Sequence, residues 1–335
     1  MKAAILEHYN KEGQDLVIKD VDMPTLKPDD ILVEVHYAAV NPLDNMIIRK
    51  EVKLIVDYPT PLIMGNEYSG VVVKVGANVK RFKVNDRVYG RTPLDHPGAF
   101  AEYIAVNENS ASRIPDYMSF KEAATVPLTA LTAMQAFELM GAKKGDTIFI
   151  SGGTGSVGAM AIPIAHRLGL KVITNGSGPN KECVLKLGAD RFIDYKKEDF
   201  SQTVHDVDCV LDTLGMSALP QEFQILKEGG HLVSLRGLPN GRFAKRLNLP
   251  WWKKMLFSIA GRKLDQLAAK KHQTYDFLFV QEDGHQLDLI NTFFNDQNPL
   301  PTSIDEVFTL DQVNRALLKL KNGHSKGKTL LAIKP

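Results

Sequence analysis

The stretch SGGTGSVG, residues 151–158, decides the fold of the second part of this chain. It follows a predicted strand, DTIFISG at 146–152, and it opens a predicted helix. In that setting the spacing Gly153-x-Gly155-x-x-Gly158 is the pattern of a dinucleotide-binding turn. One glycine permits the tight turn, one lets the backbone approach a pyrophosphate, and one lets the helix pack closely on the strand.

The start of the predicted helix, over 155–168, supports this interpretation. Ser156, Val157 and Gly158 are among its first residues, and the free N–H groups at a helix N-terminus attract phosphate. The alternative is a glycine-rich turn that binds nothing. We favour the binding turn. Three glycines at this spacing cost backbone entropy on folding, and binding of a ligand explains why they are present.

Strands and helices alternate from residue 146 onward. Helices are predicted at 155–168 and 181–187. The predicted strands are apolar or β-branched runs at 146–152, 170–176, 191–195, 207–215, 231–237 and 275–280. This alternation predicts βαβ units and a parallel sheet.

The first hundred residues have a different pattern, because short β-branched runs alternate there with glycine and proline. The predicted strands lie at 31–40, 68–76, 86–90 and 99–106, which favours a barrel-like or sandwich unit. A helix is predicted over 119–141, where Ser119 and Glu122 form a capping box. The last thirty residues predict a helix followed by a strand.

Composition bounds the class of protein. At about 150 residues per domain, 335 residues predict two domains. Lys+Arg 41 against Asp+Glu 39 gives a net charge of +2, so no chain-wide field attracts nucleic acid. Two cysteines, Cys183 and Cys209, exclude a disulfide scaffold and a four-cysteine zinc site. The apolar run at 1–10 is too short for a signal peptide, so we expect a soluble cytoplasmic protein.

The end of the second predicted strand indicates which dinucleotide binds. NAD-binding chains carry Asp or Glu there for the ribose hydroxyls, but residues 174–177 read TNGS and hold no acid. Ser177 can donate a hydrogen bond, and Lys181 can supply a cation to a 2′-phosphate. We therefore expect NADPH as the cofactor. The alternative is that Lys181 is only a solvated lysine.

A metal site is not expected. The β-rich part of the chain holds no cysteine, and its histidines, His8, His36 and His96, lie far apart in the sequence. Zinc sites need clustered Cys, His or carboxylate ligands. We therefore do not expect metal-assisted alcohol oxidation.

These motifs together resemble the medium-chain dehydrogenase/reductase superfamily, and in particular its zinc-free quinone oxidoreductase branch. The resemblance runs essentially end to end. It rests on AAVNPLD (38–44), PLIMGNEYSGVV (61–72), NDRVYG (85–90), GAFAEY (98–103), AATVPLTALTA (123–133), SGGTGSVG (151–158), LGADRFIDY (187–195), VLDTLG (210–215) and KGKTLL (326–331).

The resemblance implies an α/β protein with two domains. A GroES-like, β-rich catalytic domain would comprise 1–125 and 275–335, and a Rossmann NADP-binding domain with a doubly wound parallel sheet would comprise 126–274. It also implies that the nicotinamide lies in a cleft between the domains, and that two copies form a homodimer through edge strands of the central sheet.

The resemblance also assigns roles to single residues. Asn41, in the sequence Asn-Pro-x-x-Asp, should lie beside the nicotinamide and the substrate, and we expect it to be the catalytic residue. Zinc-dependent relatives carry a cysteine near position 41 and Gly-His-Glu at 65–67, where this chain has Asn41 and Gly-Asn-Glu. Further cofactor contacts are implied at Thr129, Tyr195, Leu214, Gly215, Phe279, Val280 and Lys328.

One segment, 242–272, is strongly basic. It holds nine Lys or Arg and one acid, which gives 9 − 1 = +8. An apolar helical face is predicted from Trp252, Met255, Leu256, Ile259, Leu267 and Ala268. We favour a surface helix pair packed over the substrate pocket. Contact with a membrane surface and binding of an anionic ligand are the alternatives.

The predicted function is reduction of a quinone by NADPH without a metal. Charge developing on the acceptor oxygen would be stabilised by hydrogen-bond donors, Asn41 among them. One alternative is reduction of the double bond of an enone or 2-alkenal. Another is an NADPH-binding interaction protein that has no turnover.

Overall fold

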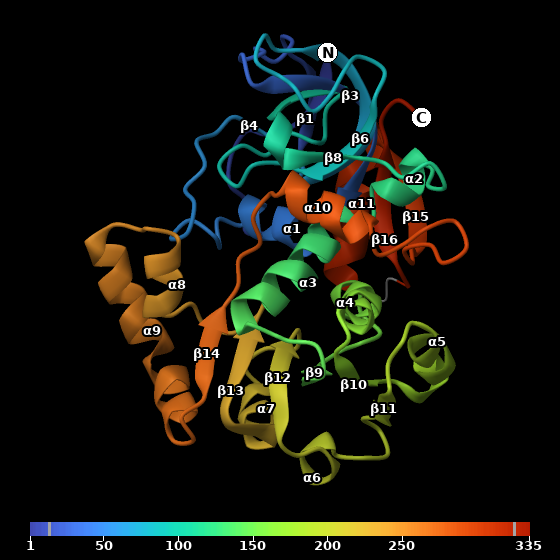
Figure 1. The fold of residues 1–335 in the computed structure, drawn as a ribbon. Helices are drawn as coiled ribbons and strands as arrows, with labels where there is room; N and C mark the ends of the chain where they lie inside the picture. Colours follow the sequence, from blue (N-terminus) through green and yellow to red (C-terminus); the bar gives the residue numbers. More distant parts are fainter. Residues whose placement is uncertain (13–14, 324–325) are drawn as a thin grey trace. The chain divides into compact units, whose positions relative to one another are not determined.

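The computed structural model describes residues 1–12, 15–323 and 326–335. Contacts divide the chain into two compact units, which we call unit 1 (Met1–Leu131 with Gln281–Pro335) and unit 2 (Thr132–Val280). The boundaries predicted from sequence were 125/126 and 274/275. Figure 1 shows the elements of both units.

Unit 2 is built on a six-stranded sheet in which every pair of neighbouring strands is parallel. The strand order is β11-β10-β9-β12-β13-β14. The strands are β9 (Thr147–Ile150), β10 (Lys171–Gly176), β11 (Arg191–Asp194), β12 (Val207–Asp212), β13 (Leu226–Ser234) and β14 (Thr274–Phe277). The order reverses between β9 and β12, and ligands bind at such a switch point in doubly wound sheets.

Helices cover this sheet, so its strands are apolar on both faces, as expected for parallel strands. Phe149, Val210 and Leu232 are fully buried at its centre. The helices are α4 (Ser156–Arg167), α5 (Lys181–Lys186), α6 (Phe200–Thr203), α7 (Leu219–Ile225), α8 (Gly241–Arg246) and α9 (Trp251–Ala269), with a 3₁₀ turn, η2, at Gly178–Asn180. Helix α3 (Pro127–Met140) begins in unit 1 and ends in unit 2.

The free edge of strand β14 is closed by side chains from the segment before it. Asn240 Nδ2 donates to the carbonyl oxygen of Tyr275 at 3.0 Å, and Arg246 Nη2 donates to that of Phe277 at 2.6 Å. An edge strand normally exposes these carbonyl groups to a second strand. Pairing of another strand with β14 would therefore have to displace Asn240 and Arg246.

Unit 1 is β-rich, as the sequence predicts. It contains a three-stranded sheet, β2-β1-β4, and a seven-stranded sheet with the path β15-β16-β3-β5-β6-β8, to which β7 adds by pairing with β3. The strands are β1 (Lys2–Leu6), β2 (Val17–Asp20), β3 (Asp30–Val40), β4 (Leu62–Ile63), β5 (Glu67–Val75), β6 (Arg87–Arg91), β7 (Tyr103–Asn107), β8 (Ala111–Arg113), β15 (Ile304–Thr309) and β16 (Lys328–Ala332).

The C-terminal strand β16 pairs antiparallel with β3, so the two ends of the chain build one sheet. The helices of unit 1 are short. They are α1 (Pro42–Ile48), α2 (Phe120–Ala123), α10 (Gly284–Asn291) and α11 (Val313–Asn322), with 3₁₀ turns η1 (Glu108–Ser110) and η3 (Leu310–Gln312).

Several element boundaries differ from the sequence prediction. The helix predicted over 119–141 is two helices, α2 and α3, although Ser119 does cap α2 with Glu122 as predicted. Strand β15 was not predicted. Strand β12 ends at Asp212, because the Asp212 carboxylate accepts the next backbone N–H groups and turns the chain out of the sheet. Strand β14 ends at Phe277, before the predicted contacts at 279 and 280.

The apolar face predicted for the basic segment is divided between two sides of α9: Trp252, Met255, Leu256 and Ile259 are exposed, whereas Ala268 is buried. Helix α9 buries Phe257, Gly261, Leu264 and Ala268. Most of the predicted face, with Ile259 at its centre, is exposed instead. The sequence pattern does not show which side of α9 is buried, because both sides of its N-terminal half carry apolar residues. In the described part of the chain, no helix is long and apolar enough to cross a membrane.

Candidate functional site

The glycine turn between β9 and α4 brings two backbone segments so close that no side chain fits between them. A Cβ atom on Gly158 would lie 2.5 Å from the carbonyl oxygen of Gly152 and 2.6 Å from Cα of Gly153. A Cβ atom on Gly153 would overlap the side chain of Thr174. Gly152 has a φ of +67°, which favours glycine. The glycine spacing read from the sequence thus has a steric cause.

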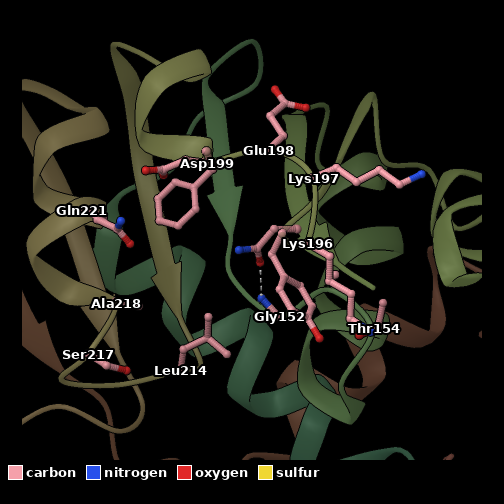
Figure 2. A pocket seen from close by; sticks show the side chains of 14 residues that line it. Gly152, Thr154, Lys196, Lys197, Glu198, Asp199, Leu214, Ser217, Ala218 and Gln221 are labelled. Carbon is pink, nitrogen blue, oxygen red and sulfur yellow. Dashed lines mark hydrogen bonds between the residues drawn. The ribbon is translucent and has the colours of Figure 1, made fainter. Parts of the chain in front are cut away.

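A buried asparagine that the sequence analysis did not assign to the site holds this turn. Asn175, in β10, accepts the N–H of Gly152 on Oδ1 at 2.8 Å, the bond dashed in Figure 2. Its backbone carbonyl accepts the N–H of Gly153 at 3.0 Å. The available signal was a polar residue at the carboxyl end of a parallel strand, where ligand sites gather.

The N-terminus of α4 carries three N–H groups that lie ahead of the first backbone hydrogen bond of the helix. Gly155 is the N-cap, and the first backbone bond of the helix runs from the Ala159 N–H to the Gly155 carbonyl at 2.9 Å. Over the described ranges, no backbone acceptor takes up the N–H groups of Ser156, Val157 and Gly158. These groups can therefore bind an anion such as a pyrophosphate.

A cavity of about 670 Å³ lies beside the turn. Its lining comes from the loops after β9, β11 and β12, from the end of β10 and from α6 and α7. The lining residues are Gly152, Thr154, Asn175, Gly176, Tyr195, Lys196, Lys197, Glu198, Asp199, Phe200, Leu214, Ser217, Ala218 and Gln221. Figure 2 shows Leu214, Ser217 and Gln221 on one wall, opposite Thr154. The cavity is therefore at the carboxyl ends of the strands beside the switch point, where nucleotides bind in such sheets.

Three lysines line a hollow next to this cavity. Lys181, Lys196 and Lys197 do so together with Asp194 and Glu198. Lys196 and Lys197 also line the cavity, so they join the two hollows. The sequence analysis singled out only Lys181 of these three, although the others form an adjacent pair directly after the third strand. The lysines outnumber the two carboxylates, which suits a dianionic phosphate.

The other residues predicted for the adenosine end lie in the same region. Tyr195 lines the cavity and is 58% exposed. Ser177 is the N-cap of the 3₁₀ turn η2 that precedes Lys181, and its Oγ accepts a hydrogen bond from Asn180 Nδ2 at 2.9 Å. The structure thus places Ser177, Lys181 and Tyr195 on adjacent loops.

Leu214 and Gly215 are held by a buried carboxylate. Asp212 Oδ1 accepts the N–H of Leu214 at 2.7 Å and that of Gly215 at 2.8 Å, while Oδ2 accepts from the Ser234 hydroxyl. Gly215 has a φ of +89°, which favours glycine. Leu214 is left partly exposed on the wall of the cavity.

In unit 1, Asn41 belongs to a buried polar cluster. Its Nδ2 donates to Glu67 Oε2 at 3.0 Å and to the Ala39 carbonyl at 3.2 Å, and its Oδ1 accepts from Lys328 Nζ at 2.7 Å. Lys328 Nζ also donates to Glu67 Oε2 at 2.7 Å. Two residues predicted for different roles, Asn41 and Lys328, thus meet in one cluster around a carboxylate that was not predicted for the site.

Glu67 is fully buried and Lys328 nearly so. The second carboxylate oxygen of Glu67 accepts the backbone N–H of Leu128 at 2.8 Å, at the start of α3. A buried ion pair of this kind is stable only when hydrogen bonds satisfy its remaining atoms. The cluster thereby joins β5, β16 and α3.

A second carboxylate, Asp44, lies beside this cluster. Its Oδ2 accepts the backbone N–H of Asn41 and its Oδ1 accepts from Asn66 Nδ2, both at 2.7 Å. Complete burial raises the pKa of Asp44 to about 7, and the hydrogen bonds from Asn41 and Asn66 only partly oppose this rise.

Three of the predicted cofactor contacts lie outside the cavity lining. Thr129 is buried in α3, and its hydroxyl donates to the carbonyl groups of Thr125 and Val126, directly before that helix. Phe279 and Val280 are half-buried in the segment after β14. The roles of these three residues stay predictions.

Comparisons with known proteins agree with this architecture. A model described as the alcohol dehydrogenase GroES-like domain matches residues 27–116. A model described as zinc-binding dehydrogenase matches residues 187–331. The predicted class, a GroES-like domain plus a Rossmann domain, is confirmed.

The chain is 38% identical over 262 residues to 2-methylene-furan-3-one reductase of Solanum lycopersicum, a match covering 72% of this chain and 67% of that one. It is 34% identical over 259 residues to the chloroplastic NADPH-dependent alkenal/one oxidoreductase of Arabidopsis thaliana, covering 74% and 66%. These matches span about two thirds of the plant proteins. The structure of the quinone oxidoreductase from Coxiella burnetii aligns with a TM-score of 0.81 at 28% identity, covering 100% and 99%.

These matches show that the chain belongs to the medium-chain dehydrogenase/reductase superfamily. Within that superfamily it falls in the quinone oxidoreductase-like branch, and it is an oxidoreductase.

Two asparagines stand where the resemblance places metal ligands in zinc-dependent relatives. The amide of Asn41 is bonded to Glu67 and Lys328, and the amide nitrogen of Asn66 is bonded to Asp44. Within residues 1–12, 15–323 and 326–335, no group of three His, Cys, Asp or Glu side chains could hold a metal ion.

The ion pair between Lys328 and Glu67 yields a first prediction. Lys328→Met leaves a buried carboxylate without its cation, so it should lower the free energy of unfolding by about 3–5 kcal/mol. Adding Glu67→Gln to that variant should recover most of the loss. Urea denaturation of the wild type, both single variants and the double variant measures the coupling. Additive effects of the two substitutions would show that the pair is not coupled. Comparison of the NADPH affinity of the double variant with that of Glu67→Gln gives any contribution of Lys328 to cofactor binding.

The raised pKa of Asp44 yields a second prediction. The folded protein keeps a proton on Asp44 up to about pH 7, whereas an unfolded chain releases it near pH 4. Stability should therefore fall as pH rises from 4 to 7, by on the order of 2–4 kcal/mol. Asp44→Asn should remove this slope in denaturation midpoints measured across that range. Asp311→Asn, at an exposed position, should retain it.

Proposed function

We propose that this protein is an NADPH-dependent reductase that transfers hydride to a quinone without a metal ion. The observation that carries the proposal is the glycine turn, where close backbone contacts exclude side chains and the free N–H groups of α4 lie beside the cavity. The family supplies the reaction class, because the relatives are oxidoreductases.

The residues of unit 2 fit a dinucleotide. The N–H groups of Ser156, Val157 and Gly158 would hold the pyrophosphate, and the absence of a side chain at Gly155 would let the phosphates approach the backbone. Leu214 and Gly215 would flank the ribose. Thr129, Phe279 and Val280 are proposed to contact the nicotinamide, on the family resemblance.

NADPH is the cofactor, as the name of the Arabidopsis relative supports. The structure offers the chemistry for its extra phosphate, because Lys181, Tyr195 and Lys196 line adjoining hollows. Ser177 is the N-cap of the turn before Lys181. No carboxylate follows β10 directly, and Asp194, the nearest acid, lies among the lysines that line the second hollow.

Bound NADPH supplies a hydride, and the acceptor gains negative charge on its carbonyl oxygen. Conjugation in a quinone spreads this charge, so a hydrogen-bond donor can suffice where a saturated ketone needs a Lewis acid. We assign that donor to Asn41. Both of its N–H groups are engaged, and its 3.2 Å bond to Ala39 is the longer one. That bond is the one a substrate oxygen would replace, while Lys328 and Glu67 keep the amide in place.

Metal independence rests on the donor set of unit 1. At positions 41 and 66 the chain offers neutral amides that neighbouring groups already occupy, and zinc prefers thiolate, imidazole or carboxylate. The cation beside Glu67 is the ammonium group of Lys328.

A second candidate substrate is an enone or 2-alkenal, reduced at its double bond. The names of the two plant relatives favour this class, whereas the Coxiella structure favours a quinone. Both acceptors place the developing charge on a conjugated carbonyl oxygen. The same site chemistry therefore serves either one.

We also propose that the protein is cytoplasmic and homodimeric. Cys183 and Cys209 are both free thiols, which suits a reducing compartment. The dimer would use a surface other than the edge of β14, because Asn240 and Arg246 occupy the carbonyl groups there.

A third prediction concerns the cofactor. NADPH should bind more tightly than NADH in a fluorescence titration. Lys181→Ala and Lys196→Ala should each weaken NADPH binding by roughly 3–30-fold with little change for NADH, as expected for loss of a partly solvated charge–phosphate contact. Lys171→Ala, at an exposed position outside both hollows, is the matched control. Equal affinities of the wild-type protein for the two nucleotides would refute the assignment.

A fourth prediction concerns the acceptor. Stopped-flow oxidation of NADPH should be faster with a naphthoquinone than with a 2-alkenal, and it should survive treatment with a chelator. A faster reaction with the alkenal would select the second candidate. Cofactor binding without turnover across a broad acceptor panel would contradict both.

A further inference from the structure

Helix α9 exposes apolar side chains on the side that faces away from its own unit. Trp251 is 75% exposed, Ile259 is 65% exposed and Met255 is 56% exposed, with Trp252 and Leu256 also above one third. Large side chains of this kind are normally buried. A contiguous exposed group of them marks an interaction surface.

The direction of this face is fixed by packing on the opposite side. At about 100° per residue, positions 257, 261, 264 and 268 fall on one side of the helix, and 252, 255 and 259 fall on the other. The first set is buried. Phe257 packs edge-on against Phe243 of α8, which in turn packs on Phe277 of β14.

Two polar contacts strengthen this anchor. Asn240, at the start of α8, donates to Asp265 of α9 at 2.8 Å and to the carbonyl of Tyr275 in β14 at 3.0 Å. Gly261 allows a close approach, because a Cβ atom there would lie 2.7 Å from Cα of Asn240. The buried face of α9 is thus fixed against α8 and β14. Figure 1 shows both helices lying beyond β14, at the end of the sheet.

Basic side chains flank the apolar group at its C-terminal end. Arg262 and Lys263 follow Ile259 by one turn and are exposed, whereas Lys253 and Lys254, which follow the tryptophans in the sequence, are half-buried. Within the described residues, none of these four forms an ion pair with a carboxylate. The acid of the segment, Asp265, is engaged with Asn240. The segment 242–272 carries 9 − 1 = +8 in a chain of +2, so the rest of the chain carries 2 − 8 = −6.

We propose that the outer face of α9 docks on the surface of a membrane that contains anionic lipid. Aromatic and aliphatic side chains surrounded by lysine and arginine are the composition of a helix that lies in the membrane interface. Tryptophan favours the headgroup region, and each basic residue near an anionic surface adds attraction. The acidic remainder of the chain is repelled by that surface, which orients the protein with α9 toward the lipid.

Charge separates this occupant from a second copy of the chain. Two α9 helices packed face to face would bring the +8 segment of one copy against the +8 segment of the other. Like charges placed together across an interface oppose association. An anionic lipid surface instead supplies the opposite charge over the whole face.

The protein contains its own reporter for the test. Its two tryptophans, Trp251 and Trp252, both lie on this helix. Tryptophan emission and vesicle flotation should therefore be measured with vesicles of phosphatidylcholine plus phosphatidylserine, and with phosphatidylcholine alone. At low salt we expect at least about tenfold stronger binding to the anionic vesicles, with a blue shift of the emission and quenching by brominated lipid. Both effects should weaken as salt is raised.

Two variants test the apolar and basic parts separately. Met255→Ser with Ile259→Ser keeps both tryptophans, and Arg262→Glu with Lys263→Glu reverses two charges; each should lower binding about tenfold or more. The matched controls should bind as the wild type does. They are Met23→Ser with Val84→Ser, at exposed apolar positions, and Lys27→Glu with Lys74→Glu, at exposed lysines. Circular dichroism and nucleotide binding confirm that each variant is folded.

Three results would overturn the proposal. The first is absence of flotation and of any spectral shift at low salt. The second is equal binding to neutral and anionic vesicles. The third is a blue shift without vesicles that grows with protein concentration, together with a dimer in sedimentation that Met255→Ser with Ile259→Ser abolishes; this would assign the face to self-association.

Discussion

Unit 1 depends on one buried ion pair, between the ammonium group of Lys328 and the carboxylate of Glu67. These residues lie 261 positions apart in the chain, yet their charged atoms are 2.7 Å apart. Around the pair, Asn41 bonds to both partners, and the backbone of Leu128 uses the second carboxylate oxygen. The C-terminal strand is therefore joined to the N-terminal sheet by charge as well as by its backbone ladder. Burial makes this pair stable only as a complete set.

The same pair bears on the metal independence proposed for this chain. A buried carboxylate at position 67 needs a cation nearby, because an isolated buried charge is very costly. Lys328 meets that need from a strand at the other end of the chain. The amide at position 41 can then be held as a hydrogen-bonding group. The carboxylate at position 67 is thus neutralised by a residue 261 positions away in the chain.

Much of the fold could be predicted from the sequence where its signals are local. The glycine spacing, the alternation of strands and helices and the cap at Ser119 each depend on a few adjacent residues, and the structure confirms them. The role of Asn175 could not be predicted, because it arises from a hydrogen bond between neighbouring parallel strands. The cluster of Asn41, Glu67 and Lys328 could not be predicted either, because its hydrogen bonds join residues that are far apart in the sequence.

The face of α9 shows a different limit. Apolar residues occupy both sides of its N-terminal half, so periodicity alone could not tell which side the protein covers. Aromatic contacts of Phe243 with Phe257 and Phe277 decide it. Large tryptophans stay outside, against the usual expectation, because the smaller Gly261 and Ala268 permit closer packing on α8 and β14.

The closed edge of β14 also bears on how the protein behaves when it is crowded or partly open. An exposed parallel strand is a template on which further chains can add, and growth of that kind leads to fibrous aggregates. Here an amide and a guanidinium group occupy the very acceptors that an incoming strand would need. Arg246 belongs to the basic segment and Asn240 lies two residues before it, so residues 240–246 shield the sheet against polymerisation for as long as they remain folded.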